Sequence, residues 1–168
     1  LLNGGSTIGE ILPTTTRALN FRLTVFDNVA GGGTSSSQDI AFQVSSAAGP
    51  FAVTAPVAAA TWDASINATE TVSWNVAGTD LAPVSCPAVD IDVYTGGGFG
   101  LSTAVLAQGI PNNGSAVVNV PNMQSTTARV RVRCANNIFF ALNPGNFTIV
   151  GPDLIFADGF EIPDSPAP

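Results

Sequence analysis

The chain of 168 residues contains no histidine and no lysine, and it has only two cysteines and one methionine. General acid–base catalysis near neutral pH mostly uses histidine, or a lysine or carboxylate with a shifted pKa. Serine is abundant, but a Ser-His-Asp triad is excluded without histidine. A usual zinc site is excluded too, because too few sulfur and imidazole ligands are present. The sequence therefore predicts a chain that is not an enzyme, with calcium as the one cofactor left to consider.

Basic charge is also scarce, since five arginines stand against 12 acidic residues and the net charge is -7. Such a balance repels nucleic acid and disfavours anionic membrane surfaces. No apolar run reaches the roughly 20 residues that a membrane-spanning helix needs. We expect no nucleic-acid partner and no membrane span.

The two cysteines, Cys86 and Cys134, lie too far apart in sequence for a CxxC redox pair. We expect them to form a disulfide, which would contribute about 3–4 kcal/mol by restricting the unfolded chain. Disulfides persist in oxidising compartments. The pair therefore indicates a secreted or extracellular location.

Residues 19–25 and 39–44 alternate strictly between apolar and polar side chains, with Gly31 to Gly33 and a serine run between them. This pattern is typical of two half-buried strands that form a hairpin. Two strands are too few for an independent domain, and the small residues at 45–50 resemble a linker. We interpret residues 1–46 as strands of a preceding or partial β-sandwich domain, or as a docking hairpin.

Further strands are expected at a spacing typical of a sandwich: residues 51–54, 70–76, 89–94, 116–120, 127–134 and 146–150. Residues 101–107 carry apolar side chains at a spacing that suits a short helical turn. The sequence predicts an all-β, antiparallel immunoglobulin-like β-sandwich over residues 47–150, followed by a C-terminal tail at 151–168.

Within this segment, Trp74 is expected in the core. Cys134 ends a strand whose inner face carries Ala128, Val130 and Val132, so the disulfide should join that face to the loop at residues 83–87. Asp90 and Asp92 alternate with apolar residues, and we interpret them as part of a solvated face that pairs with the arginines of the neighbouring strand.

Several motifs together resemble one known family: GPFAVT at 49–54, TVSWNVAGT at 71–79, APVSC at 82–86, the PNNGS turn at 111–115, ARVRVRCANNIFF at 128–140 and NFTI at 146–149. The series resembles the β-sandwich module that follows the catalytic domain in bacterial secreted reprolysin-like zinc metallopeptidases. Residues 12–25 are similar to the segment that precedes this module. No HExxH motif is present, so the catalytic activity of the family does not carry over.

The resemblance implies an accessory region of such an enzyme, or a relative that kept only this region. The tail at 151–161 looks like an ending shared by many secreted gammaproteobacterial proteins, which implies a Gram-negative source; the alternative is a last apolar strip that covers a sheet edge. The chain starts at Leu1 without methionine or leader. We expect it to belong to a longer precursor, whose upstream domains would be its partners.

Candidate binding residues are weighed against structural roles. Asp27, Asn28 and Asp39 around the glycine loop supply oxygen ligands of the kind that calcium takes, but such residues in turns usually bond their own backbone. The arginines of one strand face could bind an anion or an acidic glycan, and aromatic residues near glycine loops could stack on sugars, although ion pairing and core packing are the commoner roles. These two candidate sets are Arg129, Arg131 and Arg133, and Trp62, Tyr94 and Phe99.

Two functional hypotheses follow. The first is a non-catalytic C-terminal accessory module that stabilises, positions or helps export a secreted protein, a metallopeptidase by resemblance. The second is an extracellular binding or self-assembly module for a glycan or protein partner, in which edge strands of the hairpin add to a neighbouring sheet.

Overall fold

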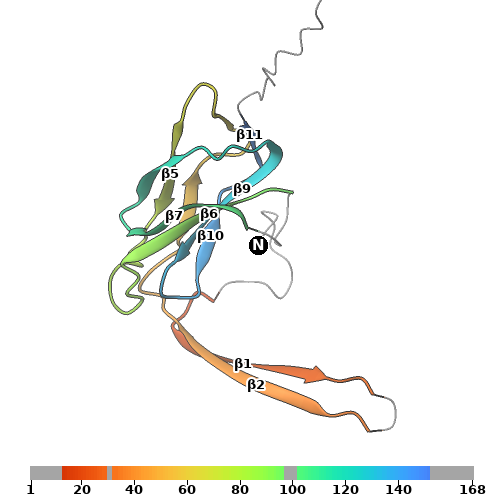
Figure 1. The fold of residues 1–168 in the computed structure, drawn as a ribbon. Coiled ribbons are helices and arrows are strands. Elements are labelled where there is room, and N and C mark those ends of the chain that lie inside the picture. The colour runs from red at the N-terminus through yellow and green to blue at the C-terminus, as the bar shows by residue number, and fades with distance from the viewer. Residues whose placement is uncertain (1–12, 30–31, 97–101, 152–168) are drawn as a thin grey trace, which may run out of the picture.

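A computed structural model describes residues 13–29, 32–96 and 102–151, and within them the regular structure is entirely β (Figure 1). No helix in these ranges is long and apolar enough to cross a membrane. The strands are β1 (Arg17–Phe26), β2 (Ser35–Val44), β3 (Ala52–Ala55), β4 (Thr61–Asp63), β5 (Thr69–Asn75), β6 (Ala88–Tyr94), β7 (Ser102–Pro111), β8 (Ser115–Asn119), β9 (Ser125–Cys134), β10 (Phe140–Leu142) and β11 (Phe147–Val150).

Strands β3 to β11 form a two-layer sandwich. One sheet has the order β3-β5-β8, and the other has the order β4-β11-β9-β6-β7, with β10 paired to β9. In immunoglobulin terms the first sheet supplies strands A, B and E, and β7, β6, β9 and β11 supply C′, C, F and G. The predicted immunoglobulin-like sandwich is therefore confirmed. One pair departs from the expected antiparallel pattern, because β4 and β11 run parallel.

The core lies between the two sheets and follows from alternation along the strands. Every second residue of β9 is buried, from Ala128 to Cys134, whereas the residues between them are half-buried. Inward side chains of β6 face the same space, and Trp74 on β5 lies opposite with only 4% exposed, as predicted. The buried aliphatic residues of the core are Val53, Val72, Val89, Ile91, Val93, Val118, Val120, Ala128, Val130, Val132 and Ile149.

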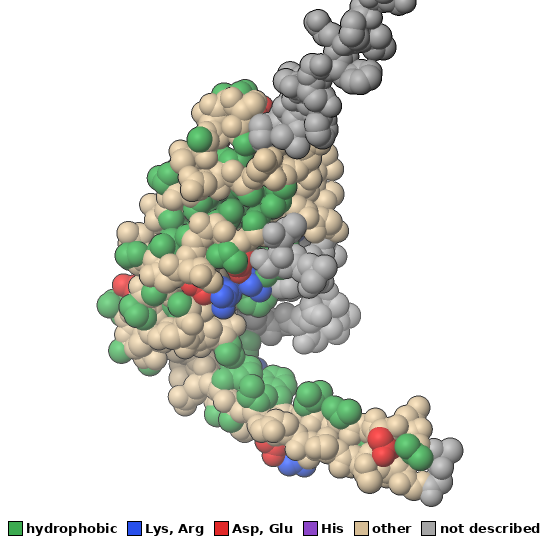
Figure 2. All heavy atoms as spheres, viewed as in Figure 1, with side chains coloured by type: hydrophobic (Ala, Val, Ile, Leu, Met, Phe, Trp, Pro, Cys, Tyr) green, Lys and Arg blue, Asp and Glu red, His purple; other side chains and the backbone are tan. Residues whose placement is uncertain are grey.

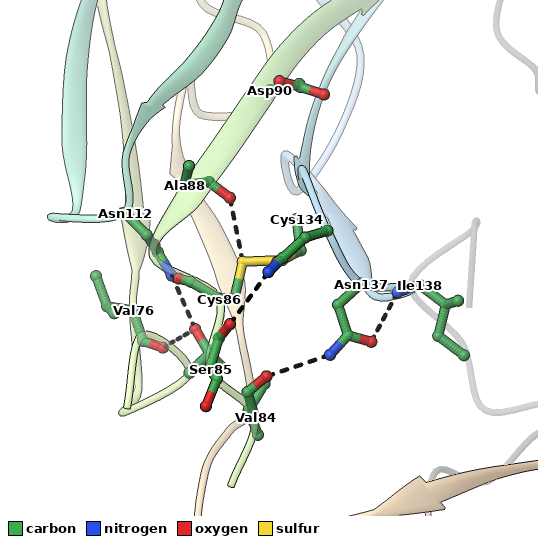
Figure 3. The surroundings of a disulfide bond; sticks show 12 residues. Val76, Val84, Ser85, Cys86, Ala88, Asp90, Asn112, Cys134, Asn137 and Ile138 are labelled. Carbon is green, nitrogen blue, oxygen red and sulfur yellow. Dashed lines mark hydrogen bonds between the residues drawn. A yellow bond between two sulfur atoms is a disulfide. The ribbon is translucent and has the colours of Figure 1, made fainter. Parts of the chain in front are cut away.

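The predicted disulfide joins Cys86, in the loop before β6, to Cys134 at the end of β9, with a Cα–Cα distance of 6.0 Å (Figure 3). Both cysteines are almost fully buried, with exposures of 0% and 1%. The loop before β6 is also held by the side-chain amide of Asn137, which donates to the Val84 carbonyl at 3.3 Å. The loop is thus fixed to β9 by the disulfide and to the turn after β9 by a hydrogen bond.

A buried polar network next to the disulfide connects the two sheets. Trp74 Nε1 donates to Asn112 Oδ1 at 2.8 Å. The side-chain amide of Asn112 in turn donates to Thr79 Oγ1 at 3.1 Å and to the Cys86 carbonyl at 3.0 Å. Trp74, Asn112 and Thr79 are all buried. Because buried polar groups are costly when unpaired, this network specifies how the indole and the disulfide loop fit together.

The predicted helical turn at residues 101–107 is wrong, because the described residues 102–107 lie in strand β7. This strand pairs with β6 through three register shifts, and the first of them lies between Val89 and Ile91. Gly109 adopts a φ of 61° there, a left-handed conformation that suits glycine. A strand with register shifts loses the regular alternation that marks a strand in sequence. Strands β4 and β10, of three residues each, were also not predicted.

Candidate functional site

Hairpin β1–β2 projects from one end of the sandwich (Figure 1). Its strands pair without a register shift from Arg17 opposite Val44 to Phe26 opposite Ser35. This register gathers most apolar side chains of both strands on one face, because side chains alternate between faces along a strand; Phe26 at the tip end of β1 lies on the other face. We define the apolar hairpin face by these residues: Leu19, Phe21, Leu23, Val25, Ile40, Phe42 and Val44.

Most of the apolar hairpin face is open to solvent. Phe21 is 52% exposed, Leu23 67%, Val25 60% and Ile40 56%. Phe21 and Phe42 stack at a centroid distance of 5.3 Å. Figure 2 shows hydrophobic side chains along the hairpin and an acidic and a basic group meeting at one of its sides. Contiguous exposed apolar surface of this kind marks an interaction site more often than scattered single residues do.

The opposite face of the hairpin carries an ion pair between Arg22 and Asp39. Arg22 Nε and Nη2 donate to the two carboxylate oxygens at 2.6 and 2.8 Å. The hydrogen bonds from Arg22 lower the pKa of Asp39, and those to Asp39 raise the pKa of Arg22. Both side chains are 65% exposed, so solvent screens the pair and it contributes little to stability. Its role is to keep this face polar and locally neutral.

The loop at the tip of the hairpin is organised by Asp27. Its carboxylate accepts hydrogen bonds from Thr34 N at 3.0 Å, from Thr34 Oγ1 at 2.9 Å and from Val29 N at 3.3 Å. Among the calcium candidates, Asn28 neighbours Asp27, whereas Asp39 lies four residues along β2 from Ser35 and is bound to Arg22. No group of three or more His, Cys, Asp or Glu residues in the described ranges could hold a metal ion. The structure therefore gives Asp27 and Asp39 separate bonding roles within the hairpin.

The pKa of Asp27 gives a first prediction. Hydrogen bonds from Thr34 and Val29 to the carboxylate lower its pKa below the ordinary value of 3.8. A lowered folded-state pKa means that the carboxylate stabilises the loop fully above 3.8 and that this contribution is lost as the pH falls through the lower folded value. We expect the Thr34 amide signal in NMR to titrate with a midpoint below 3.8, and Asp27→Asn to abolish that titration. A midpoint at or above the ordinary value would contradict this role.

The base of the hairpin is tied both to itself and to the sandwich. Thr16 Oγ1 lies 2.9 Å from Ser46 Oγ and accepts a hydrogen bond from Ser46 N at 2.9 Å. A few residues further on, Gly49 N donates to the Ala77 carbonyl at 2.8 Å, and Gly49 has a φ of 101°. The hairpin therefore leaves the sandwich from a fixed point beside the turn that follows β5.

A second polar cluster covers the outer face of β6 and β9. Asp90 lies opposite Arg133 and Asp92 opposite Arg131 in the register. Arg131 Nη2 binds Asp92 Oδ2 at 2.6 Å, and Arg133 Nη2 binds Asp90 Oδ2 at 2.7 Å. The predicted cross-strand pairing is thus confirmed. The expectation of a solvated face is wrong for the acidic residues, whose side chains are only 11% and 4% exposed.

The three candidate arginines are held by the protein itself. Arg131 also lies over the ring of Tyr94 at 4.9 Å. Arg129 Nη2 donates to the Asn143 carbonyl at 2.7 Å, and burial lowers its pKa. Arg133 approaches Asp92 as well as Asp90, with Nε 3.4 Å from Asp92 Oδ2. The structure thus uses these guanidinium groups to neutralise two buried carboxylates and to bind backbone.

The buried ion pairs give a second prediction, in which Asp92→Asn is compared with Asp39→Asn. Removing one charge of a buried pair leaves its partner uncompensated. Because Arg131 and Arg133 keep partial access to water, with 21% and 39% exposed, we expect a loss of about 2 kcal/mol from the free energy of unfolding. For the exposed Asp39 we expect a much smaller loss, because water screens its pair with Arg22. Equal losses in urea denaturation of the two variants would contradict this assignment.

The two described aromatic candidates for sugar stacking, Trp62 and Tyr94, are buried. Trp62 is 3% exposed and meets Phe147 edge-on at a centroid distance of 4.8 Å. Tyr94 is 7% exposed beneath Arg131. Phe99 lies outside the described residues. The structure therefore leaves neither Trp62 nor Tyr94 with a ring face open to a flat ligand.

Sequence reasoning missed Asn143, a fully buried residue between β10 and β11. Its Oδ1 accepts from Val130 N at 2.9 Å, and its backbone N donates to the Val130 carbonyl at 3.0 Å. Its side-chain amide donates to the carbonyls of Pro56 and Gly145 at 3.2 and 2.6 Å. The only sequence signal was an Asn-Pro-Gly turn, and such turns are normally exposed.

The fold and these contacts define an immunoglobulin-like all-β protein with a single described disulfide and a projecting hairpin. Searches against protein-family models, curated proteins and solved structures find no match.

Proposed function

We propose that this chain is a non-catalytic accessory module of a larger secreted bacterial protein and that hairpin β1–β2 docks the sandwich onto a neighbouring domain. The observation that carries this proposal is the apolar hairpin face, which is built like the half-buried layer of a sandwich yet has Leu23 and Val25 exposed by 67% and 60%. A docked partner would remove this surface from water, at about 25 cal/mol per Å² of apolar area.

The disulfide, the amino-acid composition and the family resemblance support the proposal of a secreted accessory module. The buried Cys86–Cys134 disulfide is compatible with an oxidising, extracellular compartment. The lack of histidine and lysine favours a role that requires no acid–base catalysis. The motif series resembles the module after the catalytic domain of reprolysin-like zinc metallopeptidases. We therefore propose a metallopeptidase as the parent, with the module stabilising, positioning or helping to export its catalytic domain.

A second candidate function is extracellular binding or self-assembly by strand addition. It is favoured by the outer edges of β1 and β2, which pair with no other strand of the described chain. Exposed edges of this kind can accept a strand from a protein partner or from another copy.

The natural reading frame upstream of Leu1 tests the first proposal. We expect it to encode a signal peptide and a domain with an HExxH helix, whose two histidines and following ligand would hold zinc. A reading frame in which a signal peptide ends directly before Leu1 would contradict the accessory role and leave strand addition as the better account.

A further inference from the structure

The apolar hairpin face has the composition of one layer of a sandwich, and its partner layer is absent from the described residues. Seven apolar side chains lie on one face, with Arg17 at its base, whereas the other face carries Asn20, Arg22, Thr24 and Asp39, with Phe26 at its tip end. This division is typical of antiparallel strands with one face on a core and the other in water. A two-stranded hairpin alone is marginally stable, so the face requires a cover that is itself apolar and extended.

The size of the face argues against a second copy of this chain as the cover. Ten residues in each strand correspond to a length of about 34 Å, and two strands span about 10 Å. The projected footprint is then on the order of 340 Å² per hairpin, which is small beside the roughly 800 Å² of accessible surface that each partner of a standard interface contributes. Specific interfaces between separate molecules bury about 1,200–2,000 Å².

Charge also disfavours self-association. Each copy carries a net charge of -7, whereas the charges of the described hairpin cancel, since Arg17 and Arg22 balance Asp27 and Asp39. Two copies would therefore approach through neutral hairpins while their sandwiches repel each other, and net charge of this size tends to keep proteins monomeric.

The small area of the face and the repulsion between equal net charges matter less for a partner in the same polypeptide. Covalent linkage supplies an effective concentration in the millimolar range, so a small apolar contact is sufficient. The fixed base of the hairpin, held through Thr16, Ser46 and Gly49, limits the orientations that the partner must sample. A tethered β-domain is therefore the occupant that fits the area, the charge and the anchoring.

We infer that the apolar hairpin face is the inner face of one layer in a second β-sandwich, whose opposing sheet belongs to a neighbouring domain of the same polypeptide. This inference rests on the proposed accessory role and names its partner: an apolar sheet face that covers Phe21, Leu23, Val25 and Ile40. The polar side with Arg22 and Asp39 remains in solvent.

Hydrogen–deuterium exchange on the 168-residue chain and on the longer natural polypeptide tests the inference. We expect amides of β1 and β2 to exchange at least about 100-fold more slowly in the longer polypeptide, while amides of β6 and β9 are equally protected in both. The face variant Phe21→Thr/Leu23→Thr/Val25→Thr should abolish the gain. The control variant Ala18→Thr/Asn20→Thr/Gln43→Thr, on the opposite face, should retain it.

Two measurements on the 168-residue chain guard against a face variant that simply unfolds the hairpin. The dye ANS should bind the native chain and the control variant, and the face variant should lose more than half of the fluorescence. Light scattering should show a monomer at about 100 µM. A dimer that the face variant dissociates would overturn the inference in favour of a second copy, and hairpin protection that is equal in both polypeptides would overturn it as well.

The outcomes separate this inference from the proposed function. Protection by a neighbouring domain that lacks HExxH would support the inference and contradict the metallopeptidase assignment. A peptidase domain that leaves β1 and β2 unprotected would support the accessory role and overturn the inference.

Discussion

Replacing Cys86 and Cys134 together by alanine is expected to lower the free energy of unfolding by about 4 kcal/mol. The bond joins residues separated by 48 positions, and a closed loop of that length removes much of the entropy of the unfolded chain. The two cysteines also lie in the core with exposures of 0% and 1%. The loss should therefore not be smaller than the loop-closure estimate.

Urea denaturation of the native protein and the double variant, each with and without reductant, measures this effect. Reductant should destabilise the native protein by a similar amount and leave the double-alanine variant unchanged. A loss below about 1 kcal/mol would show that the hydrogen bonds of the loop and the β6–β9 pairing suffice without the bond.

Asn143→Ala is expected to cost about 3–4 kcal/mol, because it leaves several buried groups without partners. Val130 N, which lies on the fully buried side of β9, loses its acceptor. The buried Pro56 carbonyl loses the amide that links the β3–β4 connection to the β10–β11 turn. Each unsatisfied buried group costs roughly 1–3 kcal/mol.

The matched control is Asn119→Ala on the exposed face of β8. We expect its free energy of unfolding to change by less than about 0.5 kcal/mol, as for most exposed substitutions. If Asn143→Ala lost no more stability than this control, the hydrogen bonds of the Asn143 side chain to Val130 and Pro56 would not be important for stability.

Alternation of apolar and polar residues made most of this fold predictable. The sequences of β1, β6 and β9 show the period of two directly. In β9 the apolar residues are buried and those between them half-buried, whereas β1 is exposed and β6 is buried on both faces. The positions of Trp74 and of the disulfide followed from the same periodicity. Apolar–polar alternation predicted a strand correctly wherever its pairing with the neighbouring strand is regular.

The parts that sequence did not predict depend on contacts between distant segments. Strand β7 is irregular because it pairs with β6 through register shifts. The burial of Asp92 follows from the arginines of β9, 39 positions away in the case of Arg131. The structural roles of Asn112 and Asn143 depend on groups that meet only in the folded chain, such as the indole of Trp74. Residue type alone does not distinguish these asparagines from exposed turn residues.

The candidate docking site was only partly predictable, for the same reason. The alternating residues of β1 and β2 predicted a hairpin with one apolar face. That this face is left open at Phe21, Leu23, Val25 and Ile40 is a property of the three-dimensional arrangement.

The central claim is that the sandwich is complete without the hairpin, whose own partner lies elsewhere. Deleting residues 1–46 and measuring the free energy of unfolding by urea denaturation tests it most directly. The account predicts a folded sandwich whose stability lies within about 1 kcal/mol of the whole chain, because among the described strands β1 and β2 pair only with each other. A loss above about 3 kcal/mol, or a failure to fold, would contradict the account by showing that β1 and β2 are an integral part of this sandwich.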